Sequence, residues 1–208
     1  MTVVSGPREG ATAAVEAAVV KGDIVYASHA WSPFTQEGTK TMAYELWEQL
    51  GRRAPSCLVA PIGQGSLFLG AYRGFKDLLE AGLIDELPRM IGVQSRACAP
   101  IVKAGKAGLG HHDIVRSRHS IAEGIAVPRP IHDRQILKAI YETRGDAIAV
   151  SDDEIRSAQH ELANAGLYVE PTGAATAAAL RKARLTGIVV VALTGTGLKT
   201  PTPTPARR

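Results

Sequence analysis

Two glycine-bearing loops are the strongest candidates for chemistry in this sequence. Residues 61–67 (PIGQGSL) follow an apolar run and precede a segment of helical period, and residues 193–199 (LTGTGLK) follow a second apolar run. Glycine lets a backbone approach an anion closely, and the amides at a helix N-terminus carry partial positive charge. Several such amides could hold a phosphate without an arginine. Because many strand-to-helix turns need a glycine, the local pattern leaves a purely structural turn open.

Neither loop matches a common nucleotide-binding motif. No Lys-Ser or Lys-Thr pair closes the first loop, and the three-glycine spacing of the dinucleotide fingerprint is missing. The histidines His111, His112 and His119 suggest a metal at first sight, but His160-Glu161 does not continue into a second histidine at the spacing that zinc needs. We therefore expect no metal site.

The acidic residues 152–154 have a structural explanation. Ser151 and Glu154 have the spacing of a capping box, in which each side chain bonds the other residue's backbone N–H at the start of a helix. Negative charge in the first helical turn is also favourable. Catalysis by paired carboxylates is therefore not needed to explain them.

Apolar runs of strand length alternate with segments of helical period. We expect strands at residues 24–27, 57–60, 90–93, 147–150 and 188–193, helices at 10–20, 38–50, 67–81, 133–143, 152–165 and 174–183, and a loop at about 103–120. Apolar runs without alternation are typical of strands covered on both faces. The fold class predicted is α/β, a parallel sheet with helices on both faces. Ligands bind at the carboxyl ends of such strands, so residues 63–66 and Thr194 should lie close together if the two loops share a ligand.

Composition limits the classes of protein. The chain has 208 residues and a formal net charge of +4, without the clustered Lys and Arg of a nucleic-acid face. It has only two cysteines, Cys57 and Cys98, and no apolar run long enough to span a membrane. We expect a cytoplasmic protein that binds neither nucleic acid nor membrane, with a disordered tail at 200–208, where Thr alternates with Pro.

Five segments occur in an order that resembles one enzyme family. They are residues 38–41 (GTKT), 60–70 (APIGQGSLFLG), 122–126 (AEGIA), 170–175 (EPTGAA) and 193–199 (LTGTGLK). Together they resemble the pyridoxal-phosphate-dependent enzymes of the tryptophan synthase β fold, also called fold type II, and within them the threonine synthase branch. The resemblance implies pyridoxal 5′-phosphate as the cofactor and an amino acid as the substrate.

The resemblance also implies roles for particular residues. The cofactor phosphate would be cradled by the amides of Gly63, Gln64, Gly65, Ser66 and Leu67. Thr194 would hydrogen-bond the pyridine nitrogen, and Glu170 would lie near the cofactor edge, although its Glu-Pro pair could simply end a strand. A hydroxyl cannot stabilise a pyridinium by charge as an aspartate does, so the ring would be a milder electron sink.

The implied reaction is elimination or replacement at the β or γ carbon of an amino acid such as O-phosphohomoserine. Serine and threonine dehydratases share most of these motifs, so a dehydratase-type lyase is an alternative. Gln64 and Ser66 depart from the asparagine-rich loop of many threonine synthases, and Thr196 stands where a histidine is common. These departures leave the substrate open. The family also suggests a homodimer.

In this family the lysine that forms the Schiff base lies on an earlier segment, which we do not find in this sequence. We therefore expect no catalytic residue here, and we expect Lys40, Lys76 and Lys199 to be solvated surface charges. The chain resembles the C-terminal large domain plus a remnant of the small domain. The predicted parts are 1–50 (remnant of the small lobe and crossover), 51–199 (cofactor-binding domain) and 200–208 (tail). A non-catalytic, phosphate-binding remnant is a further alternative.

Overall fold

The computed structural model describes residues 3–5, 8–112, 115 and 117–199, and divides the chain into two compact units, Met1–Pro33 and Phe34–Arg208. The first unit holds α1 (Arg8–Val20), which confirms the helix predicted there. The strand predicted at 24–27 is wrong, because these residues have no strand partner among the described ones, and Val25 is 91% exposed. A short β-branched run is not stable as a strand without a neighbour. The predicted tail lies outside the described residues.

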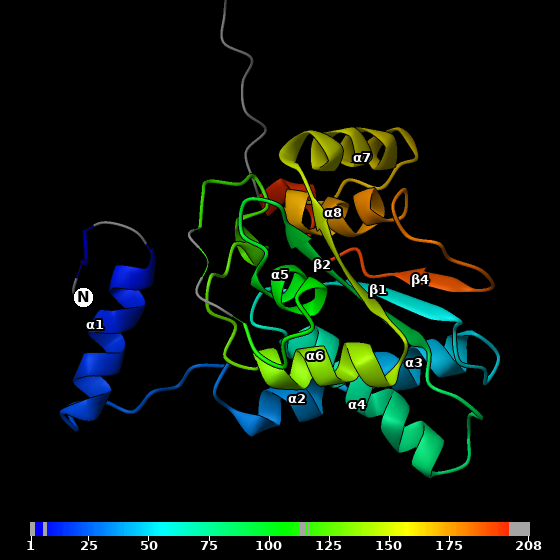
Figure 1. The fold of residues 1–208 in the computed structure, drawn as a ribbon, viewed down its shortest axis with the longest axis horizontal. Coiled ribbons are helices and arrows are strands. Elements are labelled where there is room, and N and C mark those ends of the chain that lie inside the picture. The colour runs from blue at the N-terminus through cyan, green and yellow to red at the C-terminus, as the bar shows by residue number, and fades with distance from the viewer. Residues whose placement is uncertain (1–2, 6–7, 113–114, 116, 200–208) are drawn as a thin grey trace, which may run out of the picture. The chain divides into compact units, whose positions relative to one another are not determined.

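The second unit alternates strands with helices (Figure 1). Its elements in chain order are α2 (Pro33–Thr39), α3 (Thr41–Gln49), β1 (Cys57–Pro61), α4 (Ser66–Glu80), β2 (Arg89–Ser95), α5 (Pro100–Lys106), the 3₁₀ turn η1 (Glu123–Ile125), α6 (Asp133–Glu142), β3 (Asp146–Val150), α7 (Asp152–Asn164), α8 (Pro171–Ala179), β4 (Val189–Val191) and the 3₁₀ turn η2 (Gly197–Lys199). Four of the five predicted strands are therefore present.

The four strands form one sheet in the order β3-β2-β1-β4, and every neighbouring pair is parallel. Figure 1 shows α7 and α8 on one side of the sheet and α4 and α6 on the other. This arrangement confirms the predicted fold class, a parallel sheet covered by helices on both faces.

The central strand β1 explains why its sequence shows no alternation. Leu58 and Ala60 pack with the core of α4 and α6, whereas Cys57 and Val59 pack with the core of α8. All five residues of β1 are buried. Both faces of the strand are covered, so both sets of side chains are apolar.

The helix predicted at 38–50 is instead two helices that meet at Lys40. The Thr39 Oγ1 lies 3.1 Å from each of three carbonyl oxygens that can accept its one proton, those of Thr35 and Gln36 within α2 and that of Ser66 on α4. A hydroxyl that bonds the carbonyls of its own preceding turn competes with continued helix formation. Helix α2 therefore ends where it touches α4.

Three other boundaries differ from the prediction. The predicted loop at 103–120 overlaps α5. Gln94 on β2, the strand just before it, accepts hydrogen bonds from the N–H groups of Ile101 and Val102 at 2.9 and 3.2 Å and so caps that helix. Helix α8 begins at Pro171 rather than 174, since proline is favourable in the first turn. Strand β4 keeps only three of the six residues expected.

The predicted capping box of α7 is present. The Ser151 N–H donates to Glu154 Oε2 at 2.7 Å, and the Glu154 N–H donates to Ser151 Oγ at 3.3 Å. Lys182 also lies 2.7 Å from Glu154 Oε1. Burial alone would raise the pKa of Glu154, but the hydrogen bonds from Lys182 and Ser151 outweigh it and lower the pKa to about 2.

Candidate functional site

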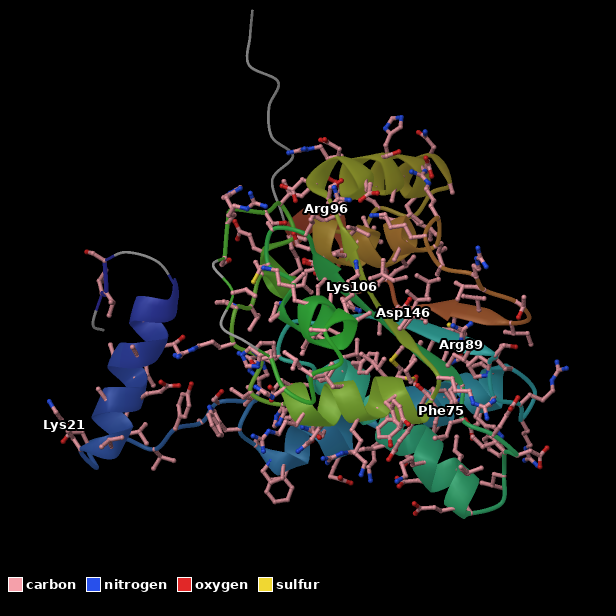
Figure 2. All side chains as sticks on the ribbon, in the orientation of Figure 1. Lys21, Phe75, Arg89, Arg96, Lys106 and Asp146 are labelled. Carbon is pink, nitrogen blue, oxygen red and sulfur yellow. The ribbon has the colours of Figure 1, made fainter. Side chains whose placement is uncertain are left out.

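The two glycine-bearing loops leave neighbouring strands at the same edge of the sheet. Strands β1 and β4 run parallel, with Val59 opposite Val191, and the N–H of Ala192 donates to the carbonyl oxygen of Val59 at 2.9 Å. The chain enters the first loop after Pro61 and the second after Val191. Figure 2 labels Arg89, the first residue of β2, and Arg96, which directly follows β2. The two labels therefore indicate the amino and the carboxyl ends of the strands. Both loops therefore leave the same end of the sheet, as the shared-site prediction requires, and the close approach of residues 63–66 to Thr194 stays a prediction.

The first loop is shaped for glycine at two positions. Gly65 has a left-handed φ of 90° at the start of α4, and a Cβ there would collide with the side chain of Ile136. A Cβ on Gly63 would lie 2.7 Å from the carbonyl oxygen of Gly124 in η1. The backbone of this loop therefore packs closely against α6 and η1. No side chain makes a capping hydrogen bond at the N-terminus of α4. The first amides of a 15-residue helix have no intrahelical partners, so they are available to an anion.

Two hydroxyls at this edge are buried without a hydrogen-bond partner among the described residues, Ser66 Oγ in the first turn of α4 and Thr194 Oγ1 in the second loop. A buried polar group left unsatisfied costs about 1 to 3 kcal/mol, so native structures rarely keep one without a reason. A phosphate at the start of α4 would satisfy Ser66. An aromatic ring nitrogen beside β4 would satisfy Thr194.

Helix α8 holds the backbone of Thr194 in place. A Cβ on Gly173 would lie 2.7 Å from the Thr194 carbonyl oxygen and 3.1 Å from its nitrogen, so only glycine allows this close approach. One turn later, Thr176 Oγ1 donates to the carbonyl oxygens of Gly173 and Ala192, at 2.6 and 3.1 Å. The end of β4 is therefore fixed against the first turns of α8.

The structure also brings Glu170 to the second loop. Its N–H donates to the carbonyl oxygen of Gly195 at 3.2 Å, and a Cβ on Gly195, whose φ is 73°, would collide with the Glu170 carboxylate. Glu170 occupies the N-cap position of α8, but its side chain makes no capping hydrogen bond. The carboxylate lies over Gly195, one residue from Thr194.

The side chains of the two remaining residues predicted for the first loop, Gln64 and Leu67, have different surroundings. Gln64 Oε1 accepts a hydrogen bond from the N–H of Ile131 at 3.1 Å, so its carboxamide oxygen is already used. Leu67 lines an open groove of about 350 Å³, together with Thr39 and Met42. Gln64 and Leu67 can therefore contribute backbone amides to an anion site, while their side chains serve the surrounding structure.

The expectation that Lys40 is a solvated surface charge is wrong. Its ammonium lies 2.8 Å from Glu37 and 2.9 Å from Asp77, and its side chain is only 17% exposed, so it is not a solvated surface charge. The hydrogen bonds to Glu37 and then to Asp77 raise the pKa of Lys40 above its usual value. Lys76 lies over the Tyr72 ring, 6.0 Å from its centroid, and Lys199 is exposed in η2. Lys40 is held as a cation and is unsuited to act as a nucleophile.

The sequence interpretation missed a chain of hydrogen bonds beside the site. Ser95 Oγ donates to Ser120 Oγ, and Ser120 Oγ donates to Asp152 Oδ1, each at 2.8 Å. Asp152 Oδ2 also accepts from the N–H of Ile121 at 3.2 Å. Asp152 therefore anchors the segment that leads into η1, in addition to favouring the start of α7. No local signal links these residues, because they come from three distant segments.

The part of the chain that the structure describes contains no cluster of three metal-binding side chains.

Comparisons with known proteins agree with this geometry. Residues 1–195 match the family model described as "Pyridoxal-phosphate dependent enzyme". The threonine synthase of Methanocaldococcus jannaschii is 35% identical over 190 residues, which cover 88% of this chain and 47% of that protein. The threonine synthase of Mycobacterium tuberculosis (strain ATCC 25618 / H37Rv) is 36% identical over 177 residues, covering 82% and 47%. The chain thus spans about half the length of these curated relatives.

Solved structures show the same fold. The crystal structure of a threonine deaminase from T.th. superposes with a TM-score of 0.66 at 25% identity, covering 84% of this chain and 61% of that one. Maize serine racemase superposes with a TM-score of 0.74 at 19% identity, covering 93% and 57%, which is a likeness of fold alone. Within the described residues, none of the helices is both long and apolar enough to cross a membrane.

Proposed function

Because the chain belongs to the family of pyridoxal-phosphate-dependent enzymes, we propose that the edge formed by the start of α4 and the end of β4 binds pyridoxal 5′-phosphate. The observation that carries this proposal is the pair of buried, unpartnered hydroxyls, Ser66 Oγ and Thr194 Oγ1, which follow two neighbouring parallel strands. The amides of Gly63, Gln64, Gly65, Ser66 and Leu67 hold the phosphate. Thr194 donates to the pyridine nitrogen, and Glu170 borders the ring.

The residues beside the ring nitrogen favour one class of chemistry. When bound, pyridoxal phosphate supplies an electron sink for the substrate's amino-bearing carbon. The Thr194 hydroxyl is neutral and cannot stabilise a positive charge on the ring nitrogen. A neutral partner suits elimination or replacement at the β or γ carbon. The fixed backbone around Gly173 and Thr194 keeps this hydroxyl in a constant position.

The activity we propose for the whole protein is that of a threonine synthase-like lyase, acting on an amino acid such as O-phosphohomoserine. The support is the 35–36% identity to proteins named threonine synthase over most of this chain. A serine or threonine dehydratase is the second proposal, supported by the likeness to a threonine deaminase structure. A non-catalytic phosphate-binding protein is the third, supported by the ion pairs that immobilise Lys40.

One set of assays separates these proposals. The purified chain is given pyridoxal phosphate and then O-phosphohomoserine, L-serine or L-threonine, and inorganic phosphate and oxo acid are measured. Release of phosphate supports the threonine synthase-like activity, whereas oxo acid from serine or threonine alone supports the dehydratase. Tight cofactor binding with no turnover supports the non-catalytic protein. Absence of saturable binding of pyridoxal phosphate contradicts all three.

We propose a homodimer in the cytoplasm as the setting of this activity. Cys57 is a free thiol buried in β1, and burial raises its pKa, as expected of an unreactive structural thiol. Light scattering coupled to gel filtration measures the mass in solution. A mass of twice 22.0 kDa supports the dimer, and a mass of 22.0 kDa contradicts it.

A further inference from the structure

The short turn η1 lies between the two loops of the proposed cofactor site. A Cβ on Gly63 in the first loop would lie 2.7 Å from the carbonyl oxygen of Gly124 in η1. A Cβ on Gly124 itself would lie 2.8 Å from Oγ1 of Thr172, in the first turn of α8. The next residue of α8, Gly173, contacts the backbone of Thr194 equally closely. The two loops are therefore connected, through η1 and the start of α8, by close contacts at three glycines.

Hydrogen bonds from outside these loops fix the segment that leads into η1. Asp152 Oδ1 accepts from the Ser120 hydroxyl at 2.8 Å, and Asp152 Oδ2 accepts from the N–H of Ile121 at 3.2 Å. Ser120 Oγ accepts in turn from the Ser95 hydroxyl at 2.8 Å and from the N–H of Ala122, the N-cap residue of η1, at 3.2 Å. Both serines are buried, so these bonds are shielded from water. One carboxylate thus holds the two consecutive residues that precede the N-cap of η1.

The start of α7 does not explain these contacts of Asp152. Ser151 and Glu154 already form the capping box of α7, and Asp153 supplies a further negative charge to the first turn. Both aspartates favour the helix dipole. Asp153, however, is 96% exposed and pairs with Arg156 on its own helix, whereas Asp152 binds a segment 31 and 32 residues away. The contacts of Asp152 therefore serve η1 in addition to α7.

We propose that Asp152 is a positioning residue for the cofactor site, which through Ser120 and Ile121 holds η1 in the place that sets the spacing between the two loops. The inference rests on the proposed function, because it names a residue that supports the same site. The carboxylate acts through η1 rather than on the ligand itself. A ligand that contacts both loops depends on their spacing, whereas a ligand held by the first loop alone depends on it much less.

The test compares the wild-type chain with the variants Asp152→Ala and Asp152→Asn. Alanine removes both acceptors, while asparagine keeps an oxygen for the Ile121 N–H and offers an amide to the Ser120 oxygen. Asp153→Ala is the matched control, because it removes a carboxylate that pairs with Arg156 from the same helical turn. Each protein is titrated with pyridoxine 5′-phosphate, which would contact both loops without a covalent bond, and with inorganic phosphate, which would contact the first loop. Urea denaturation measures its free energy of unfolding.

We expect Asp152→Ala to bind pyridoxine 5′-phosphate about five- to tenfold more weakly, because binding must then order a loosened η1, and to change the affinity for inorganic phosphate by less than about twofold. Asp152→Asn should recover most of the affinity, and Asp153→Ala should bind as wild type does. In ¹H–¹⁵N spectra of the ligand-free chain, the amides of Gly63 and Gly124 should shift in Asp152→Ala and stay in place in Asp153→Ala.

Unchanged affinity of Asp152→Ala for pyridoxine 5′-phosphate, or an equal loss in Asp153→Ala, would overturn the positioning role and leave the proposed function intact. An equal loss of affinity for inorganic phosphate, with no recovery in Asp152→Asn, would indicate general loosening of the fold and would also overturn the inference. A wild-type chain that does not bind pyridoxine 5′-phosphate saturably would overturn both. If Asp152→Ala does not fold, Ser120→Ala, which removes the hydroxyl between Ser95 and Asp152, decides by the same criteria.

Discussion

Ser66 and Thr194 illustrate how single hydroxyls point to a site. Each is buried and unpartnered, whereas Thr176, on the neighbouring helix, donates to two carbonyl oxygens. We expect Thr194→Val to weaken binding of pyridoxal phosphate by about five- to tenfold without lowering the free energy of unfolding, because no protein hydrogen bond is lost. Titration by protein fluorescence and urea denaturation measure the two quantities.

Thr176→Val is the control for this prediction. It removes two hydrogen bonds of a fully buried hydroxyl and should lower the free energy of unfolding by about 1 to 2 kcal/mol. If Thr194→Val were as destabilising as Thr176→Val, or if it bound the cofactor as well as wild type does, the assignment of Thr194 would be wrong.

The lowered pKa of Glu154 makes part of the free energy of unfolding depend on pH. Its folded pKa of about 2 lies below the ordinary value of 4.5, so its stabilisation is fully present above pH 4.5 and is lost as the pH falls from 4.5 toward 2. Glu154→Gln keeps the capping box but loses the charge that pairs with Lys182. We expect a loss of about 0.5 to 1 kcal/mol in unfolding free energy at pH 7, shrinking toward zero near pH 2.

Urea denaturation across this pH range measures the effect, with Asp153→Asn as the control. Asp153 pairs with Arg156 while 96% exposed, so its removal should change stability little at any pH. A Glu154→Gln penalty that is independent of pH would contradict the electrostatic explanation.

At the scale of elements, α4 and its neighbours are held at close range by glycines. A Cβ on Gly74 would lie 2.6 Å from the Lys40 carbonyl oxygen and 2.8 Å from Ala43 Cβ, and one on Gly70 would collide with Thr39. We expect Gly74→Ala to lower the free energy of unfolding by about 1 to 3 kcal/mol through overpacking. Gly38→Ala on α2 meets no atom within 4 Å and should be neutral or stabilise by up to about 1 kcal/mol. Equal effects of the two changes in thermal denaturation would refute the close-packing argument.

The strands and α7 could be predicted because their signals are local. The run that became β1 is apolar on both faces, and Ser151 with Glu154 marks the start of α7 within four residues. The errors arose where tertiary contacts decide. Residues 24–27 have strand-forming side chains but no partner among the described residues, and α5 is capped by Gln94 from another element.

At the scale of the whole molecule, the order of motifs in the sequence predicted a shared site. The sheet explains how motifs far apart in the sequence can take part in it, because the strands that precede them are neighbours. Parallel strands β1 and β4 bring Gly65 and Thr194 to one edge. The contacts of Asp152 with Ser120 and Ile121 could not be predicted, because they depend on packing between segments far apart in the sequence.

The lysines of this sequence lead to a prediction for the whole chain. Lys40 has a raised pKa and two carboxylate partners, and Lys138 and Lys182 are also ion-paired. A protonated, immobilised amine is a poor nucleophile. We expect borohydride reduction of the chain with pyridoxal phosphate to label no single lysine stoichiometrically, as read by peptide mapping. Full labelling of one lysine, with turnover lost on its replacement by alanine, would show that this chain supplies its own nucleophile.

The central claim is that two loops far apart in the sequence form one cofactor site. Pyridoxine 5′-phosphate lacks the aldehyde and so tests this site without any covalent step. In ¹H–¹⁵N spectra of the labelled chain, we predict saturable shifts at the amides of residues 63–67 and 193–196 together, with much weaker shifts for pyridoxine. Shifts confined to one loop, spread over the exposed lysine and arginine surface, or equal for the two compounds would contradict the account.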